Sequence, residues 1–199
     1  MDMNFLRRRM FAGSNGGGGL PSGYTQYNYI EATAQSAYID TGVLASSDLV
    51  IQFHLYLARA NGDHIIGANG TTDSNDFRYF TATNKEYFDM KNGRLTYSLG
   101  YPPQEVTREL GNFYIKDLST GIVLASGDSF VDWSIPNNVN IGHNNNMLGV
   151  KIYFVKIYNS GTLVRDFVPV YSTLNEQYGL FDMVNKAFYG HDNFTGGNT

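Results

Sequence analysis

Paired carboxylates are the side chains of this sequence with the most direct route to catalysis. A retaining glycosidase needs two of them about 5 Å apart, one as acid and one as nucleophile. The sequence holds five glutamates, namely Glu31, Glu86, Glu105, Glu109 and Glu176. Only Glu105 and Glu109 are near neighbours, and on one strand they would share a face roughly 13 Å apart. We therefore expect no catalytic residue. The alternative is a hydrolase site formed by two aspartates that are distant in the sequence and meet in the fold.

Metal-ligating residues show no spacing typical of a metal site. The four histidines, His54, His64, His143 and His191, are widely separated, and the sequence has no cysteine. No structural zinc site is therefore predicted. The segment Asp73–Asp76 (DSND) could supply oxygens to calcium, but it lacks the Gly and the distal Glu of an EF-hand loop. We favour a solvated turn there and predict no cofactor.

Aromatic side chains next to short polar ones could bind a glycan, because flat rings pack on sugar C–H groups while amides and carboxylates bind hydroxyls. The candidate glycan-binding residues are Tyr56, Tyr79, Tyr87, Tyr97, Tyr101, Trp133 and Asn144. Asn144 belongs to the Asn-rich segment 137–146 (NNVNIGHNNN), which is either a recognition loop or a flexible polar turn. For each ring taken alone, packing in the core or at a sheet edge is the simpler interpretation.

Strands must position these residues, since apolar runs alternate with Gly, Asn, Asp and Pro clusters about every ten residues. The clearest strand is 48–58 (DLVIQFHLYLA), whose leucines, isoleucine and phenylalanine alternate with polar residues. One face of this strand is predicted to lie in the core and the other to be partly wet. Hairpin turns are predicted at Asn92-Gly93, at Ser119-Thr120-Gly121 and at Asn159-Ser160-Gly161. An aromatic content of 15% also favours strands over long helices.

The length of 199 residues suffices for one substantial core, and a β-sandwich of this size commonly uses the whole chain as a single domain. We predict that this domain spans residues 20–199. It carries 11 basic and 17 acidic residues, a net charge of −6. A mildly acidic domain binds polyanions poorly, so no nucleic-acid partner is expected. No apolar run approaches the ~20 residues of a membrane span, so none is predicted.

Residues 1–19 form a separate segment, predicted to be a flexible N-terminal arm. A short hydrophobic and basic piece is followed by a Gly-rich run with four consecutive glycines from Gly16. We predict that the arm attaches to a neighbouring protein, while a frayed terminus or a cloning remnant is the alternative. The candidate attachment residues are Phe5, Leu6, Arg7, Arg8, Arg9 and Phe11. Because the arm lacks the continuous apolar segment of a secretory signal, synthesis and folding in a cytoplasm are expected, and the alternative is that an export signal has been removed.

Two separated segments carry a resemblance to a known family. They are residues 20–42 (LPSGYTQYNYIEATAQSAYIDTG) and residues 150–189 (VKIYFVKIYNSGTLVRDFVPVYSTLNEQYGLFDMVNKAFY). Together they resemble the opening and closing strands of a concanavalin A-like (laminin G-like) jelly-roll domain, of the sort that recurs in proteins of gut bacteria and their bacteriophages. The resemblance implies an all-β jelly-roll β-sandwich whose first and last strands lie close together. In the closing segment, Arg165-Asp166 is predicted to provide a strand-end ion pair or a turn bond, a structural role rather than a ligand contact.

The resemblance implies a non-enzymatic bacteriophage virion surface protein, such as a head fibre, a decoration protein or a tail appendage. In this interpretation the arm binds capsid or tail proteins, and the chain forms a symmetric homo-oligomer, for example a trimer. Weak sites for host-surface glycans would then gain avidity from many copies. The protein would be made in the host cytoplasm and reside on the virion surface. The alternative is a bacterial carbohydrate-binding or glycan-processing module, although the glucanase pattern Glu-x-Asp-x-x-Glu of this family is absent.

Overall fold

The fold is built from β-strands. The computed structural model describes residues 19–58, 64–68, 76–91, 93–98, 104–128, 134–142 and 147–198, and within these ranges every helix or strand element is a strand. In chain order the strands are β1 (Tyr24–Gln26), β2 (Tyr29–Ala32), β3 (Ile39–Ser46), β4 (Leu49–Leu57), β5 (His64–Ala68), β6 (Asp76–Ala82), β7 (Lys85–Lys91), β8 (Gly93–Ser98), β9 (Gln104–Gly111), β10 (Tyr114–Asp117), β11 (Val123–Ser126), β12 (Ser134–Ile141), β13 (Lys151–Asn159), β14 (Thr162–Ser172), β15 (Gln177–Asp182), β16 (Ala187–Gly190) and β17 (Phe194–Gly197).

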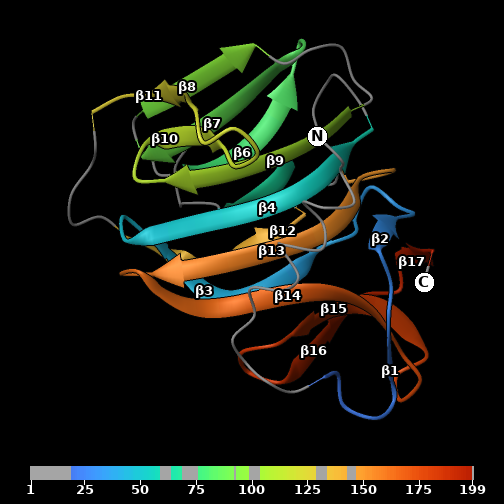
Figure 1. Cartoon of the computed structure of the whole chain (residues 1–199). Helices are drawn as coiled ribbons and strands as arrows, with labels where there is room; N and C mark the ends of the chain where they lie inside the picture. The colour runs from blue at the N-terminus through green and yellow to red at the C-terminus, as the bar shows by residue number, and fades with distance from the viewer. Residues whose placement is uncertain are drawn as a thin grey trace.

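Two antiparallel sheets pack together as a β-sandwich, which confirms the predicted all-β fold class (Figure 1). The larger sheet has the order β11-β10-β9-β4-β13-β14-β15-β16, with β1 beside β14, β2 beside β13 and β17 beside β2. The smaller sheet has the order β3-β12-β5-β6-β7-β8. Edge strands of the two sheets approach each other at both ends, β11 near β8 and β16 near β3. The core is therefore enclosed by both sheets.

The strand predicted at residues 48–58 is confirmed as β4. Leu49, Ile51, Phe53, Leu55 and Leu57 are buried and belong to the main core cluster. The alternate residues Val50, Gln52 and Tyr56 are partly exposed on the outer face, as the two-residue period of a strand requires. His54 lies on this outer face and is nevertheless buried by neighbouring side chains.

The strands that the three predicted hairpin turns would join are paired, although Asn92 lies outside the described residues and Gly93 is already the first residue of β8. Strands β7 and β8 pair with Met90 opposite Gly93, β10 pairs with β11, and β13 pairs with β14. Ser160 and Gly161, which join β13 to β14, have φ angles of 48° and 77°. Two consecutive residues with positive φ are the requirement of a type I′ turn, whose twist matches that of the flanking strands. The turn chemistry in the sequence therefore predicted strand neighbours correctly.

The front and back segments of the chain meet in the larger sheet. Strand β1 pairs with β14, with Tyr24 opposite Ser172, and β2 pairs with β13, with Ile30 opposite Ile152. The last strand, β17, pairs with the other edge of β2. The prediction that the first and last strands lie close together is confirmed.

A buried ion pair links the two sheets. Arg108 of β9 donates to both carboxylate oxygens of Glu86 of β7, with Nη2–Oε1 at 2.7 Å and Nε–Oε2 at 2.9 Å. Its Nη1 donates to Asp117 at 2.6 Å, and the Tyr79 hydroxyl donates to Glu86 at 2.8 Å. Burial alone would lower the pKa of Arg108, but the hydrogen bonds and charge of Glu86 outweigh it and raise that pKa.

Arg165 and Asp166 do form ion pairs, each with a separate partner and within β14 rather than at its end. Consecutive residues of a strand point to opposite faces, so these two side chains diverge. Arg165 lies 3.6 Å from the buried carboxylate of Asp182 and donates to the carbonyl of Thr41 on the other sheet at 2.8 Å. Asp166 pairs instead with Lys156 of the adjacent strand at 3.6 Å. Arg165 therefore provides a second link between the sheets.

Candidate functional site

Polar and aromatic side chains gather on the outer face of the larger sheet, the face turned toward the viewer in Figure 1. The register places Glu105 of β9 opposite Tyr56 of β4, and Tyr56 opposite Lys151 of β13. Cross-strand partners share a face, so these side chains are neighbours. We call the group the Glu105 cluster, and its members are Tyr29, His54, Tyr56, Glu105, Lys151 and Tyr153.

A β-bulge brings Tyr153 into this cluster. Ile152 pairs with Leu55 and Phe154 pairs with His54, so Tyr153 is an extra residue in β13. A bulge of this kind redirects a side chain relative to the regular alternation. The Tyr153 ring stacks on the His54 ring with centroids 4.3 Å apart and planes inclined by 19°. The bulge thus supplies a ring that a regular strand would place elsewhere.

Hydrogen bonds fix the Glu105 carboxylate. The hydroxyl of Tyr153 donates to Oε1 at 2.8 Å, and Nε2 of His54 lies 3.3 Å from Oε2. These contacts come from two strands, β13 and β4, which hold the carboxylate at a defined position on the sheet. A fixed carboxylate of this kind is suited to accept hydrogen bonds from ligand hydroxyls.

The ammonium group of Lys151 lies between two tyrosine rings. Its Nζ is 4.5 Å from the ring centroid of Tyr29 and 5.3 Å from that of Tyr56, and it also pairs with Glu31 at 3.7 Å. Burial alone would lower the pKa of Lys151, but the contacts with Tyr29 and Glu31 raise it above its ordinary value. Lys151 therefore stays charged at neutral pH and holds the two rings in place.

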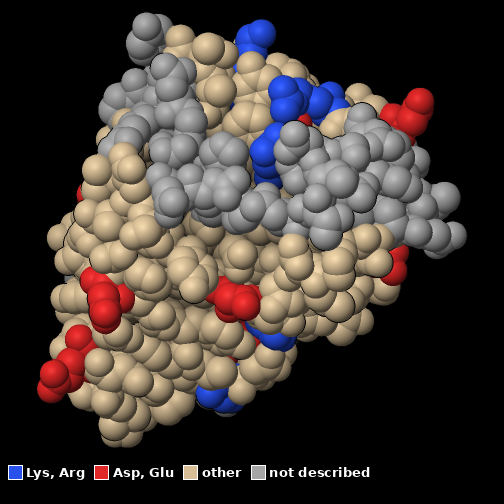
Figure 2. All heavy atoms as spheres, turned by 180° about the vertical axis from the view of Figure 1, so that it is seen from behind, with Lys and Arg blue, Asp and Glu red and all other residues tan. Residues whose placement is uncertain are grey.

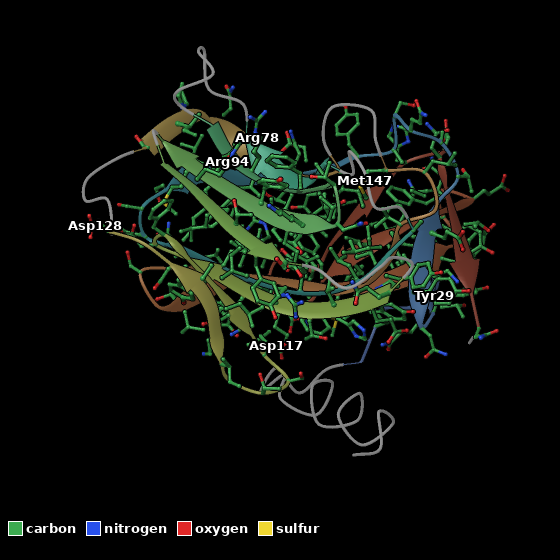
Figure 3. All side chains as sticks on the ribbon, turned by 90° about the horizontal axis from the view of Figure 1, so that it is seen from above. Tyr29, Arg78, Arg94, Asp117, Asp128 and Met147 are labelled. Atoms are coloured by element: carbon green, nitrogen blue, oxygen red, sulfur yellow. The ribbon has the colours of Figure 1, made fainter. Side chains whose placement is uncertain are left out.

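The absence of a side chain at Gly197 makes room for Tyr29. Gly197 of β17 pairs with Tyr29 of β2, and a Cβ atom at position 197 would lie 2.1 Å from the Tyr29 ring. Figure 3 shows Tyr29 on β2 beside the C-terminal strand. The last strand therefore helps to orient a ring of the Glu105 cluster.

A second carboxylate, Glu109, lies on the same face of β9. It accepts hydrogen bonds from Gln52 at 2.6 Å, Tyr114 at 2.9 Å and Lys116 at 3.2 Å. Burial alone would raise the pKa of Glu109, but these three donors outweigh it and lower that pKa. Four residues of strand separate Glu105 from Glu109, roughly 13 Å, which exceeds both the retaining and the inverting spacing of glycosidases. This pair suits hydrogen bonding rather than glycoside hydrolysis.

The four described candidate tyrosines, Tyr56, Tyr79, Tyr87 and Tyr97, do not share one environment. Tyr56 is a member of the Glu105 cluster. Tyr87 lies on the outer face of the smaller sheet, where it pairs with Phe80 and Thr96. Tyr97 is opposite Glu86 and is partly buried.

Tyr79 is fully buried. It shares the inner face of β6 with Phe77, and its ring packs against Phe53 of the other sheet at 5.0 Å. Its hydroxyl is used by Glu86, so Tyr79 does not face solvent where a glycan would bind. The alternation of β6 is apparent only once the strand is placed between its neighbours.

The remaining candidates lie outside the described residues. For glycan binding these are Tyr101, Trp133 and Asn144. For attachment they are Phe5, Leu6, Arg7, Arg8, Arg9 and Phe11. The segment considered for calcium, Asp73–Asp76, lies outside them apart from the backbone of Asp76. Within the described ranges, no group of three or more His, Asp or Glu side chains is arranged to hold a metal ion.

Sequence reasoning missed five members of the Glu105 cluster. The alternation of β4 carried a signal for His54, since it placed this residue on the same face as Tyr56. Glu105 was considered only as a partner of Glu109, because the strand opposite β9 was unknown. The missed members are Tyr29, His54, Glu105, Lys151 and Tyr153.

Comparison with models of known protein families finds no match to this chain, and comparison with curated proteins finds none either. No helix long and apolar enough to cross a membrane occurs in the part of the chain that the structure describes.

Proposed function

We propose that this chain is a non-enzymatic bacteriophage virion surface protein, such as a head fibre, a decoration protein or a tail appendage. In this proposal residues 1–19 attach it to capsid or tail proteins. The sandwich, a laminin G-like jelly roll, faces outward as part of a symmetric homo-oligomer. The Glu105 cluster binds host-surface glycans.

The observation that carries the proposal is the pairing of the two segments on which the resemblance rests. Residues 20–42 contribute β1 and β2 to the larger sheet, where they pair with β14 and β13 of residues 150–189. Such pairing is what the resemblance implies for the opening and closing strands. Because the match lies in a seam of the sandwich, it supports the architecture and leaves the outer faces to specify the ligand.

The chemistry of the Glu105 cluster supports glycan binding. Partly exposed Tyr29 and Tyr56 provide ring surface for sugar C–H groups, and the fixed Glu105 carboxylate accepts from hydroxyls. Lys151 pairs with Glu31, and the cluster also holds the Glu105 carboxylate, so it carries no excess of positive charge. Neutral sugars are therefore the ligand class that this cluster favours. A single such site binds weakly, and an array of copies on a virion compensates through avidity.

Two variants of the full chain test the two halves of the proposal separately. Deleting residues 1–19 is expected to abolish incorporation into virions and to leave glycan binding intact, because all described strand pairings lie between Tyr24 and Gly197. Tyr56→Ala is expected to leave incorporation intact and to weaken binding on an array of neutral bacterial-surface glycans about tenfold. Tyr56→Phe, which keeps the ring, serves as the control.

The outcomes separate this proposal from its alternative. Normal incorporation of the truncated chain would contradict attachment through the arm. Release of sugars from a polysaccharide by the purified protein would favour a bacterial glycan-processing module instead. Equal glycan binding by the wild-type chain and Tyr56→Ala would remove the Glu105 cluster as the glycan site.

A further inference from the structure

A group of basic and aromatic side chains occupies the outer face of the smaller sheet, on the side of the molecule opposite the Glu105 cluster. Cross-strand register places Arg78, Asp89 and Arg94 in one row of β6, β7 and β8, and Phe80, Tyr87 and Thr96 in the next row. Figure 3 shows Arg78 and Arg94 close together on one layer of the sandwich. We call the group the Arg94 patch, and its members are Arg78, Phe80, Lys85, Tyr87, Asp89 and Arg94.

The guanidinium of Arg94 is fixed by one edge and open at another. Its Nε and Nη2 donate to the two oxygens of Asp89 at 2.6 Å and 2.8 Å. This uses the side-on edge of the guanidinium fork. The end-on edge, formed by Nη1 and the second N–H of Nη2, donates no hydrogen bond to a residue that the structure describes. The Arg94 side chain is 53% exposed. A second carboxylate could bind this edge bidentately without displacing Asp89.

Two aromatic rings lie within cation–π distance of the same guanidinium. Phe80 and Tyr87 stack with centroids 5.0 Å apart and planes inclined by 10°. The guanidinium carbon of Arg94 is 5.5 Å from the Phe80 centroid and 5.4 Å from the Tyr87 centroid. Thr96, exposed on β8 opposite Tyr87, adds a hydroxyl. A sugar ring packed on Tyr87 would therefore carry its substituents toward the guanidinium.

The local charge of the patch is opposite to that of the whole chain. Among the described side chains of the patch, Arg78 and Arg94 share the Asp89 carboxylate and Lys85 adds a further positive charge, while the chain as a whole has a net charge of −4. Figure 2, which views the side opposite to that of Figure 1, shows several Lys and Arg side chains near one another in the upper part of the surface and others near its lower edge. Positive charge concentrated on an acidic protein attracts anionic ligands to that place.

We propose that the Arg94 patch is a second carbohydrate site and that it binds a carboxylated sugar, such as a uronic or a sialic acid. The sugar ring packs on Tyr87, and its carboxylate accepts from the end-on edge of Arg94. This assignment goes beyond the proposed function, because it concerns the other sheet and an acidic ligand class. The outer face of the larger sheet would then bind neutral sugars, and the outer face of the smaller sheet would bind acidic sugars.

Titration of the full chain with an oligosaccharide ending in glucuronate, followed by calorimetry, tests the assignment. Its matched control ligand ends in glucose. We expect binding of the glucuronate ligand at least tenfold tighter than that of the glucose ligand. Arg94→Gln should remove this preference, and Arg94→Lys, which keeps the charge but loses the fork, should restore it only in part. Lys186→Gln, which removes an exposed positive charge in the turn between β15 and β16, should leave it unchanged.

Three outcomes would overturn the assignment. One is equal affinity for the two ligands, and another is unchanged glucuronate binding by Arg94→Gln. The third is displacement of glucuronate by inorganic sulfate at the same concentration, which would identify a general anion site. Tyr56→Ala should not affect glucuronate binding, so failure of the Glu105 cluster and failure of the Arg94 patch give different results.

Discussion

Arg108 and Glu86 place opposite charges in the interior between the two sheets, where Glu86 is fully buried. Removing a charge from water is costly, and only a well-aligned partner compensates for it. Here the alignment is good, since Arg108 donates hydrogen bonds to both carboxylate oxygens of Glu86 and to one carboxylate oxygen of Asp117. The pair is therefore sensitive to the loss of either partner.

Arg108→Met is expected to lower the free energy of unfolding by about 3–5 kcal/mol, because it leaves the buried Glu86 carboxylate without its counter-ion. Urea denaturation followed by tryptophan or tyrosine fluorescence measures the change. The double variant Arg108→Met with Glu86→Gln removes both charges and keeps an acceptor for Tyr79. It should be more stable than the single variant Arg108→Met. Strict additivity of the two single changes would contradict the coupling.

Single residues were only partly predictable from the sequence. The sequence alternation of β4 predicted which face each of its residues occupies. Leu, Ile and Phe stand at every second position, so only one face of the strand can pack into the core. Glu86 and Arg108 were not predicted as partners, since they lie on different sheets and no local pattern joins them. The same limit applies to Tyr79, whose burial depends on Phe53 across the core.

Turns and bulges determine which side chains meet at the scale of the strand. The hairpins were predictable because Asn, Ser and Gly accept positive φ angles, as at Ser160 and Gly161. The bulge at Tyr153 was not predictable, because no residue type in KIYFVKIYN marks the irregular pairing with β4. The candidate site depends on this bulge and was therefore largely missed.

Substitutions at Gly142 and Gly161 separate two costs of adding a side chain, the strain of a positive φ angle and a steric clash with a neighbour. Both have positive φ, 85° and 77°, but a Cβ at Gly142 would lie 2.4 Å from the carbonyl oxygen of Ala37, whereas one at Gly161 would have nothing within 4 Å. Gly161→Ala is expected to lower the unfolding free energy by about 1–2 kcal/mol through its backbone angle alone. Gly142→Ala should cost about 4 kcal/mol, because the clash with Ala37 adds to the strain.

Thermal or urea unfolding of the two glycine variants provides the measurement. The Gly161 variant serves as the control for the left-handed backbone angle. Equal destabilisation of both variants would mean that the contact with Ala37 contributes nothing.

The whole molecule is expected to lose stability on acidification. At Asp117, as at Glu109, burial alone would raise the pKa; hydrogen bonds from Ser119 and Thr120 and the charge of Arg108 outweigh it and lower the pKa. A lowered pKa means that the stabilisation is fully present above the unfolded-state pKa, near about 4, and is lost as pH falls through the folded-state value. Asp166, whose pKa burial raises, acts in the opposite direction.

Urea midpoints measured from about pH 6 down to about pH 3 test this expectation. The midpoint should fall with pH, and Glu109→Gln should flatten the fall while lowering the midpoint at neutral pH. Glu176→Gln, in the exposed turn between β14 and β15, serves as the control for loss of a carboxylate. An unchanged slope in Glu109→Gln would show that Glu109 does not contribute to the acid transition.

The sandwich as a whole was predictable because strand periodicity, turn chemistry and the paired end segments all pointed to it. The outer faces were not, because strand order decides which side chains become neighbours there. Glu105, Tyr56 and Lys151 lie far apart in the sequence and become one row only through the order β9-β4-β13. The fold was therefore more accessible to sequence reasoning than the ligand-binding surfaces.

The pairing of β2 with β17 determines where the end of the described chain lies on the sandwich. The backbone N–H of Asn28 donates to the carbonyl of Asn198 at 2.9 Å, so the last described residue of the chain lies beside the start of β2. A peptide fused after Asn198 would therefore begin beside Tyr29, within reach of the Glu105 cluster.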